Sequence, residues 1–115
     1  MSLCVFVDDP AADPDDIAAK FIEPAGFEDF RRLLWGAEAV RRRAPMLARI
    51  TQNLEVAPAE FDEFERQSSI LADRAEEIAA ELGWSSSERI KAYADTFLSA
   101  VAFARAKGSE LIYVG

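Results

Sequence analysis

Apolar residues recur every three or four positions through most of the chain, and this spacing predicts helices. Positions 61, 64, 68, 71, 75, 78 and 82 are Phe, Phe, Ser, Leu, Ala, Ile and Leu, so six of the seven are apolar. We therefore expect one continuous helix over 58–82 that ends at Gly83. A last helix is expected over 86–107. Its stretch 96–104 carries no charge, which places it at the centre of the fold with the 58–82 helix antiparallel to it.

Three shorter helical segments are expected before these two. The first begins at Asp13 and Pro14, a typical helix start, and carries an apolar face as far as Ile22. The second, over 27–43, ends in three consecutive arginines whose charge complements the helix dipole. The third segment leaves two alternatives open: residues 46–54 have helical spacing, whereas 50–56 alternate as a strand would, and helix is the preferred interpretation.

Short β-branched and aromatic runs at the two ends of the chain predict two strands, over 3–7 and 111–114. Both runs are apolar on both faces, so we expect both faces to be covered. We expect the two strands to pair with each other and to bring the chain ends together. The predicted fold is mainly α: about five helices forming a compact helical bundle with short N- and C-terminal β-strands, in one domain over 1–115.

The chain is acidic, with a net charge of −8, and the charge is unevenly placed. Residues 1–30 carry −7, residues 31–49 carry +5 and residues 50–115 carry −6. An acidic protein disfavours nucleic acid and anionic membranes as partners and favours a basic protein surface. No apolar run approaches the roughly 18 residues of a membrane span, and a lone Cys4 is typical of the cytoplasm.

The stretch DDPAADPDD at 8–16 is the first candidate for a metal site. An EF-hand calcium loop needs a central glycine and a glutamate at position twelve, and neither is present. Asp8 or Asp9 at a strand end is a candidate Mg²⁺ ligand, but adjacent side chains on an extended chain point apart. The preferred interpretation is a turn at Asp8-Asp9-Pro10 followed by a helix start.

Acidic residues on the predicted 58–82 helix form the second candidate. Glu60 and Glu63 have the Glu-x-x-Glu spacing with which helical nucleotide pyrophosphohydrolases hold Mg²⁺, but no matching pair follows on the last helix. A metal-dependent nucleotide or phosphate-ester hydrolase, completed in a dimer, is therefore an alternative function. The preferred role of this face is binding a basic partner, and the residues assigned to it are Asp62, Glu63, Asp73, Glu76, Glu77 and Glu81.

An arginine cluster is the third candidate, with Arg31, Arg32, Arg42 and Arg43 assigned as an anion-binding strip. Arg31 and Arg42 are eleven residues apart, as are Arg32 and Arg43, so each pair shares one face of a helix. Such a strip binds phosphate or carboxylate groups, or it pairs with acidic helices of the same molecule. Pairing within the molecule is the preferred interpretation.

Catalytic chemistry has little support in the composition. The chain contains no histidine, which removes the usual general base at neutral pH, and no glycine-rich phosphate loop. We predict no catalytic residue, no metal and no cofactor. The leading hypothesis is a non-catalytic, cytoplasmic protein-binding module of the inhibitor or immunity-protein type. A self-assembling structural protein, or a homodimer, is the remaining alternative.

Overall fold

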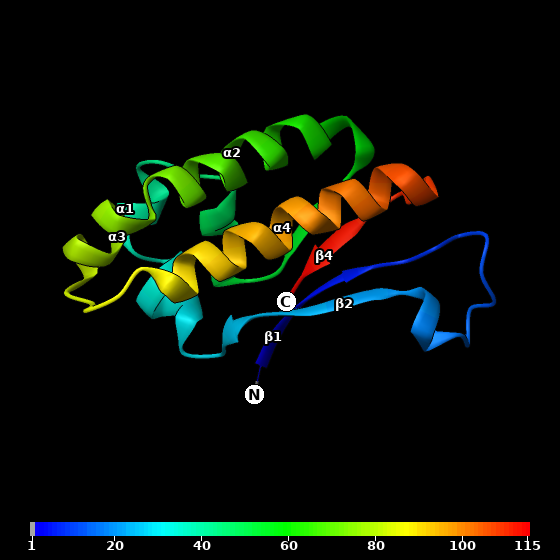
Figure 1. The fold of residues 1–115 in the computed structure, drawn as a ribbon, viewed down its shortest axis with the longest axis horizontal. Coiled ribbons are helices and arrows are strands. Elements are labelled where there is room, and N and C mark those ends of the chain that lie inside the picture. The colour runs from blue at the N-terminus through cyan, green and yellow to red at the C-terminus, as the bar shows by residue number, and fades with distance from the viewer. Residues whose placement is uncertain (1) are drawn as a thin grey trace.

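In the computed structural model, a four-stranded antiparallel sheet forms one layer and the helices form the other (Figure 1). The structure describes residues 2–115. The sheet has the order β2-β1-β4-β3, with strands β1 (Ser2–Val7), β2 (Phe21–Phe27), β3 (Leu54–Val56) and β4 (Ile112–Val114). The helices are α1 (Glu38–Arg41), α2 (Phe61–Asp73), α3 (Ala75–Leu82) and α4 (Glu88–Lys107). Within residues 2–115, no helix is long and apolar enough to cross a membrane.

The predicted mainly helical bundle is wrong, because the fold is α+β with a full sheet. The error lies in the segment after Asp13, where the predicted helix reduces to a 3-10 turn at Ile17–Ala19. After Lys20, the seven residues Phe21–Phe27 form β2, which pairs with β1 so that Ile22 lies opposite Phe6. Helical spacing in this segment is a weak local preference, and pairing with an apolar neighbouring strand overrides it.

The predicted pairing of the two terminal strands is confirmed. β1 and β4 are antiparallel neighbours, with Val5 opposite Val114. Cys4 and Gly115 extend the ladder by two backbone hydrogen bonds, with N···O distances of 3.1 and 3.0 Å. The sheet is larger than predicted because β2 and β3 add one strand on either side of this pair.

The continuous helix predicted over 27–43 is also wrong, because the helical conformation is interrupted after Gly36. A π-helical turn at Arg31–Trp35 precedes the break, and α1 follows it. A side chain at Gly36 would place its Cβ 2.9 Å from the carbonyl oxygen of Arg31. Ala37 is then extended, with ψ of 144°, which ends any continuous helix.

The two remaining helical predictions are correct in part. A 3-10 turn forms at Leu47–Thr51, but the strand alternative holds for Leu54–Val56, so the preferred helix is wrong there. The helix predicted over 58–82 is interrupted at Arg74, which separates α2 from α3. Its apolar face is nevertheless buried as expected from Phe61 to Ile78.

Helix α4 occupies the centre of the molecule, as predicted. It packs against the sheet on one side and runs antiparallel to α2 on the other (Figure 1). The Phe97 ring joins the parts of this core, because its centroid lies 5.5 Å from that of Trp35 and 5.4 Å from that of Phe64. Phe97, Trp35 and Phe64 are completely buried. Strands, helices and the π-helical turn therefore share one hydrophobic core.

Replacement of Phe97 by alanine tests this central role. Loss of a fully buried ring leaves a cavity, and we expect Phe97→Ala to lower the free energy of unfolding by about 3–5 kcal/mol. Urea unfolding followed by circular dichroism measures the change. Phe27→Ala is the matched control, because Phe27 is 52% exposed and packs edge-to-face on Phe30. Its expected cost is about 0.5–1.5 kcal/mol, and equal losses in the two variants would contradict the assignment.

Candidate functional site

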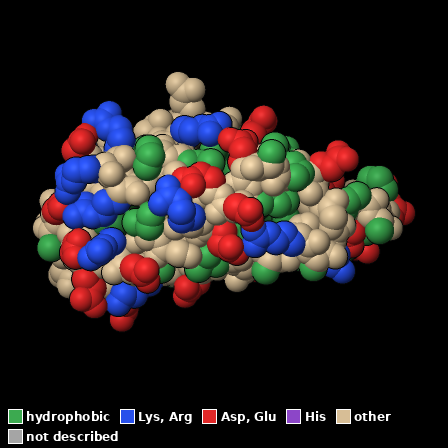
Figure 2. All heavy atoms as spheres, turned by 90° about the horizontal axis from the view of Figure 1, so that it is seen from above, with side chains coloured by type: hydrophobic (Ala, Val, Ile, Leu, Met, Phe, Trp, Pro, Cys, Tyr) green, Lys and Arg blue, Asp and Glu red, His purple; other side chains and the backbone are tan. Residues whose placement is uncertain are grey.

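The acidic residues assigned to partner binding are largely engaged by basic residues of the same chain. Asp62 pairs with Arg105, and Glu63 with Arg66. Lys91 lies 3.3 Å from Glu76. In Figure 2, acidic and basic side chains alternate over this helical side of the molecule. The helix face therefore lacks the continuous negative surface that the sequence suggested.

Glu81 is bound by two arginines from another element of the fold. It accepts hydrogen bonds from Arg42 and Arg43, at 2.6 and 2.7 Å. These hydrogen bonds lower the pKa of Glu81 from 4.5 to about 2, and the bond from Arg43 has the larger effect. Arg43 also lies 3.6 Å from Glu77. These contacts join α3 to the end of α1. They also engage Arg42 and Arg43, two of the arginines assigned to anion binding, in ion pairs within the molecule.

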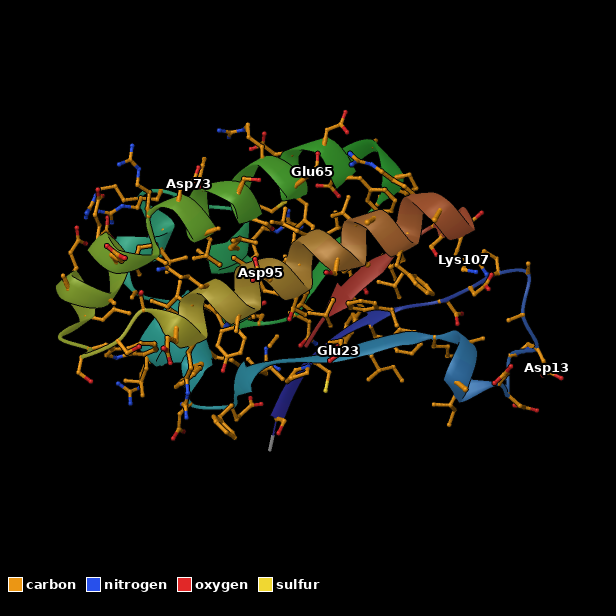
Figure 3. The ribbon with its side chains drawn as sticks, viewed as in Figure 1. Asp13, Glu23, Glu65, Asp73, Asp95 and Lys107 are labelled. Atoms are coloured by element: carbon orange, nitrogen blue, oxygen red, sulfur yellow. The ribbon has the colours of Figure 1, made fainter. Side chains whose placement is uncertain are left out.

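Asp73 differs from the other five acids, because it makes no ion pair within the part of the chain that the structure describes. It lies at the end of α2 and is exposed (Figure 3). A single exposed carboxylate supplies little binding energy by itself.

The other two arginines assigned to anion binding are separated from Arg42 and Arg43. Arg31 donates to Glu28 at 2.6 Å and to the carbonyl oxygen of Ile50 at 3.2 Å, so it fastens the π-helical turn to a neighbouring segment. Arg32 is exposed. Because the 27–43 helix is broken, the predicted strip of four arginines on one face does not form. Three of the four instead stabilise the fold by pairing within the molecule.

The residues proposed for metal binding have other roles. Glu60 lies 3.6 Å from Arg49, and Glu63 accepts hydrogen bonds from Arg66 and Gln67. Asp9 accepts a hydrogen bond from the Ala11 N–H at 3.0 Å, the geometry of a turn. No group of three or more His, Cys, Asp or Glu residues is arranged to hold a metal ion within residues 2–115.

The outer face of the sheet is the feature that the sequence analysis missed. Figure 1 shows the helices on one side of β1 and β2, and the opposite side is open within residues 2–115. Side chains at Leu3, Val5 and Val7 point inward and are buried, so Cys4 and Phe6 point outward. Register then places Ile22 and Tyr113 beside Phe6 on this outer face.

This outer face is unusually apolar for a sheet that faces water. Antiparallel sheets with one solvated side normally alternate apolar residues inward with polar residues outward. Here one row across the sheet consists of Ile22, Phe6, Tyr113 and Glu55, so three of its four members are apolar or aromatic. Ile22 is 44% exposed, and Leu111, immediately before β4, is 41% exposed. The face therefore offers apolar surface that a partner can bury.

The acidic loop, residues 8–20, extends from one end of this open face. It connects β1 to β2 and projects away from the helices, with Asp13 near its tip (Figures 1 and 3). Residues 1–30 hold eight acids and one lysine, so their net charge of −7 is nearly the whole charge of the protein. Asp13, Asp15 and Asp16 are exposed. Six of the eight acids lie on the β1–β2 hairpin and its loop, so much of the net negative charge is concentrated there.

One signal for this site was present in the sequence. The run over 3–7 is apolar on both faces, which indicates that both faces are covered. The position of Ile22 was hidden, because its segment has helical spacing and was assigned to a helix. Without β2, Phe6 and Ile22 have no reason to be neighbours, and the row of outward apolar side chains is invisible.

Comparisons of the chain with protein-family models, with curated proteins and with solved structures found no match.

Titration of Glu81 gives a measurable consequence of the pairing between helices. Its pKa is about 2 in the folded protein and 4.5 ordinarily, so its stabilising effect is present above pH 4.5 and is lost as the pH falls towards 2. We expect Glu81→Gln to be less stable than wild type at neutral pH, with the difference shrinking over this acidic range.

Thermal unfolding at a series of pH values measures this difference. Asp73→Asn is the matched control, because it removes the same charge from a residue with no ion pair within residues 2–115. If the difference in melting temperature between wild type and Glu81→Gln stays constant with pH, the stabilising role of the Glu81 carboxylate is contradicted.

Proposed function

We propose that this chain is a protein-binding module that docks a basic protein surface against the open face of its sheet. The observation that carries the proposal is the row Ile22, Phe6 and Tyr113 on the outer side of the sheet, where polar residues are expected. Protein interfaces have an apolar, aromatic centre and a polar rim, and this face has that composition. Inhibitors and immunity-type proteins that block a basic target would act in this way.

The acidic loop supplies the electrostatic part of the proposal. A concentrated negative charge attracts a positively charged partner over a distance of about one Debye length and speeds association. The helical side lacks this excess, because five of its six assigned acids are paired internally. The surface first assigned to partner binding is therefore replaced by the hairpin and the sheet.

The size of the face supports an interface that also includes the loop. Strands about 4.8 Å apart and about 3.4 Å per residue give a flat face of at most roughly 400 Å². A stable interface buries about 800 Å² on each partner, so the remaining contact has to come from beyond the sheet. The acidic loop is continuous with the end of β1 and is placed to supply it.

Self-association through the sheet edges has less support. Edge strand β2 contains Pro24, which lacks an N–H donor, and has an irregular register opposite β1. The other edge strand, β3, is only three residues long. Association of two copies would also bring together their residues 1–30, each with a net charge of −7, and this repulsion is unfavourable.

Binding assays with two kinds of variant test the proposal. Wild-type protein immobilised as bait should retain a basic protein from source lysate, and the purified pair should bind less tightly as the salt concentration rises. We expect Ile22→Ser to weaken the purified complex by about tenfold, because roughly 1–2 kcal/mol of apolar burial is lost. Reversal of Asp13, Asp15 and Asp16 to lysine should mainly slow association.

Two matched controls make this test specific. Leu33→Ser removes a similar apolar side chain that is 41% exposed but lies outside the sheet. Asp73→Lys reverses an exposed charge on the helical side. Neither control should change the affinity. If Ile22→Ser binds as tightly as wild type while Leu33→Ser does not, the open face is the wrong surface and the proposal fails.

A further inference from the structure

A small pocket lies at the corner where the open face meets the acidic loop. It has a volume of about 270 Å³, and its lining residues are Phe6, Asp8, Pro10, Ser109, Glu110 and Leu111. The pocket joins the end of β1 to the segment between α4 and β4. Ser109 is buried and its hydroxyl donates a hydrogen bond to the backbone carbonyl of Asp8, which holds the two walls together.

The walls of this pocket combine two kinds of chemistry. Phe6, Pro10 and Leu111 provide apolar surface, whereas Asp8 and Glu110 provide carboxylates. Asp8 is largely exposed, with 59% of its side chain accessible, and Glu110 is exposed as well. Arginine and lysine match such a site, because their aliphatic stems lie along apolar surface while their charged ends stay at its edge.

The volume restricts the occupant further. Pockets for small-molecule ligands are typically about 300–1,000 Å³, so this one is below that range. A single side chain from a protein partner is the occupant that the size favours. Arginine is also the basic residue most enriched in protein interfaces, and its planar guanidinium can contact a carboxylate with two hydrogen bonds.

The chain already holds one cation beside the same two residues. The Lys20 Nζ lies 5.6 Å from the centre of the Phe6 ring and 3.7 Å from a carboxylate oxygen of Asp8. Lys20 comes from the β2 side of β1, whereas Leu111 and Glu110 belong to the β4 side. Phe6 and Asp8 thus attract a basic side chain on one flank, and the pocket lies on their other flank.

We infer that this pocket receives one arginine or lysine side chain of the basic partner, with its stem against Phe6 and Leu111 and its charge beside Asp8 and Glu110. This inference rests on the proposed function and names the anchor point within it. The pocket is the concave part of the proposed interface, and energetically dominant residues cluster in such pockets. The partner's anchor is therefore a basic residue and not an aromatic one.

Nuclear magnetic resonance titration with blocked amino acids tests the pocket directly. The probes are N-acetyl-arginine methylamide and N-acetyl-lysine methylamide, with N-acetyl-citrulline methylamide as a neutral analogue of the arginine compound. Added to the full chain at low salt, the two basic probes should shift the amide signals of Phe6, Ser109 and Leu111 and reach saturation. The citrulline compound should not shift these signals, because it retains the aliphatic stem of arginine but lacks its positive charge.

Substitutions within the pocket separate its two contributions. Glu110→Gln should weaken binding of the arginine probe by roughly twofold to fivefold, the range of one exposed charge pair. Leu111→Ser should weaken it similarly by removing the apolar wall. Both side chains are exposed, so the variants should keep the wild-type spectrum elsewhere. Replacement of Asp13, Asp15 and Asp16 by asparagine is the control and should leave the pocket shifts in place.

The outcomes distinguish this inference from the proposed function. If the basic probes shift only loop signals, or if citrulline shifts the pocket signals equally, the pocket is not a cation site. If Glu110→Gln and Leu111→Ser bind the purified partner as wild type does, while Ile22→Ser does not, the inference fails and the proposed function stands. If no basic protein binds wild type at all, the proposed function fails.

Discussion

Burial of α4 between the sheet and the remaining helical segments is the constraint on which the rest of the structure depends. Phe97 contacts Trp35 on one side and Phe64 on the other, so one ring connects segments far apart in the sequence. Helix α4 covers the inner side of β1 and β2, and α2 covers α4 in turn. Because all of this packing uses one side of the sheet, the other side stays open. The exposure of the apolar residues on that side is a consequence of the same architecture.

Charge is arranged by the fold and not only by the composition. Arg42, Arg43 and Arg105 reach across to acids on α2 and α3, so the helical layer is close to neutral (Figure 2). These exposed pairs contribute modestly to stability, but they remove the helix face as a strongly acidic surface. The β1–β2 hairpin, residues 2–27, has six acids and a single lysine. Negative charge therefore remains beside the open face of the sheet.

These two features together are the basis of the proposed binding surface. A row of apolar and aromatic side chains on β2, β1 and β4 would supply area to bury, and the acidic loop would supply long-range attraction to a basic surface. The pocket formed by Phe6, Leu111 and Glu110 lies at their junction and adds a concave point of attachment. Neither the helical acids nor the arginines first singled out take part in this surface. Most of them, with Asp73 and Arg32 as exceptions, form ion pairs within the molecule.

The sequence alone determined the central helix, the pairing of the terminal strands and the buried face of 61–78, because each rests on a strong local pattern of apolar residues. It also determined the acidity and its concentration in 1–30. Only the tertiary structure decided that Phe21–Phe27 is a strand, since that outcome depends on hydrogen bonds to β1. The extended backbone at Ala37, which interrupts the predicted helix after Gly36, was likewise visible only in the structure. The proposed binding face was decided at the same level, because Ile22, Phe6 and Tyr113 become neighbours only through strand register, which no local pattern specifies.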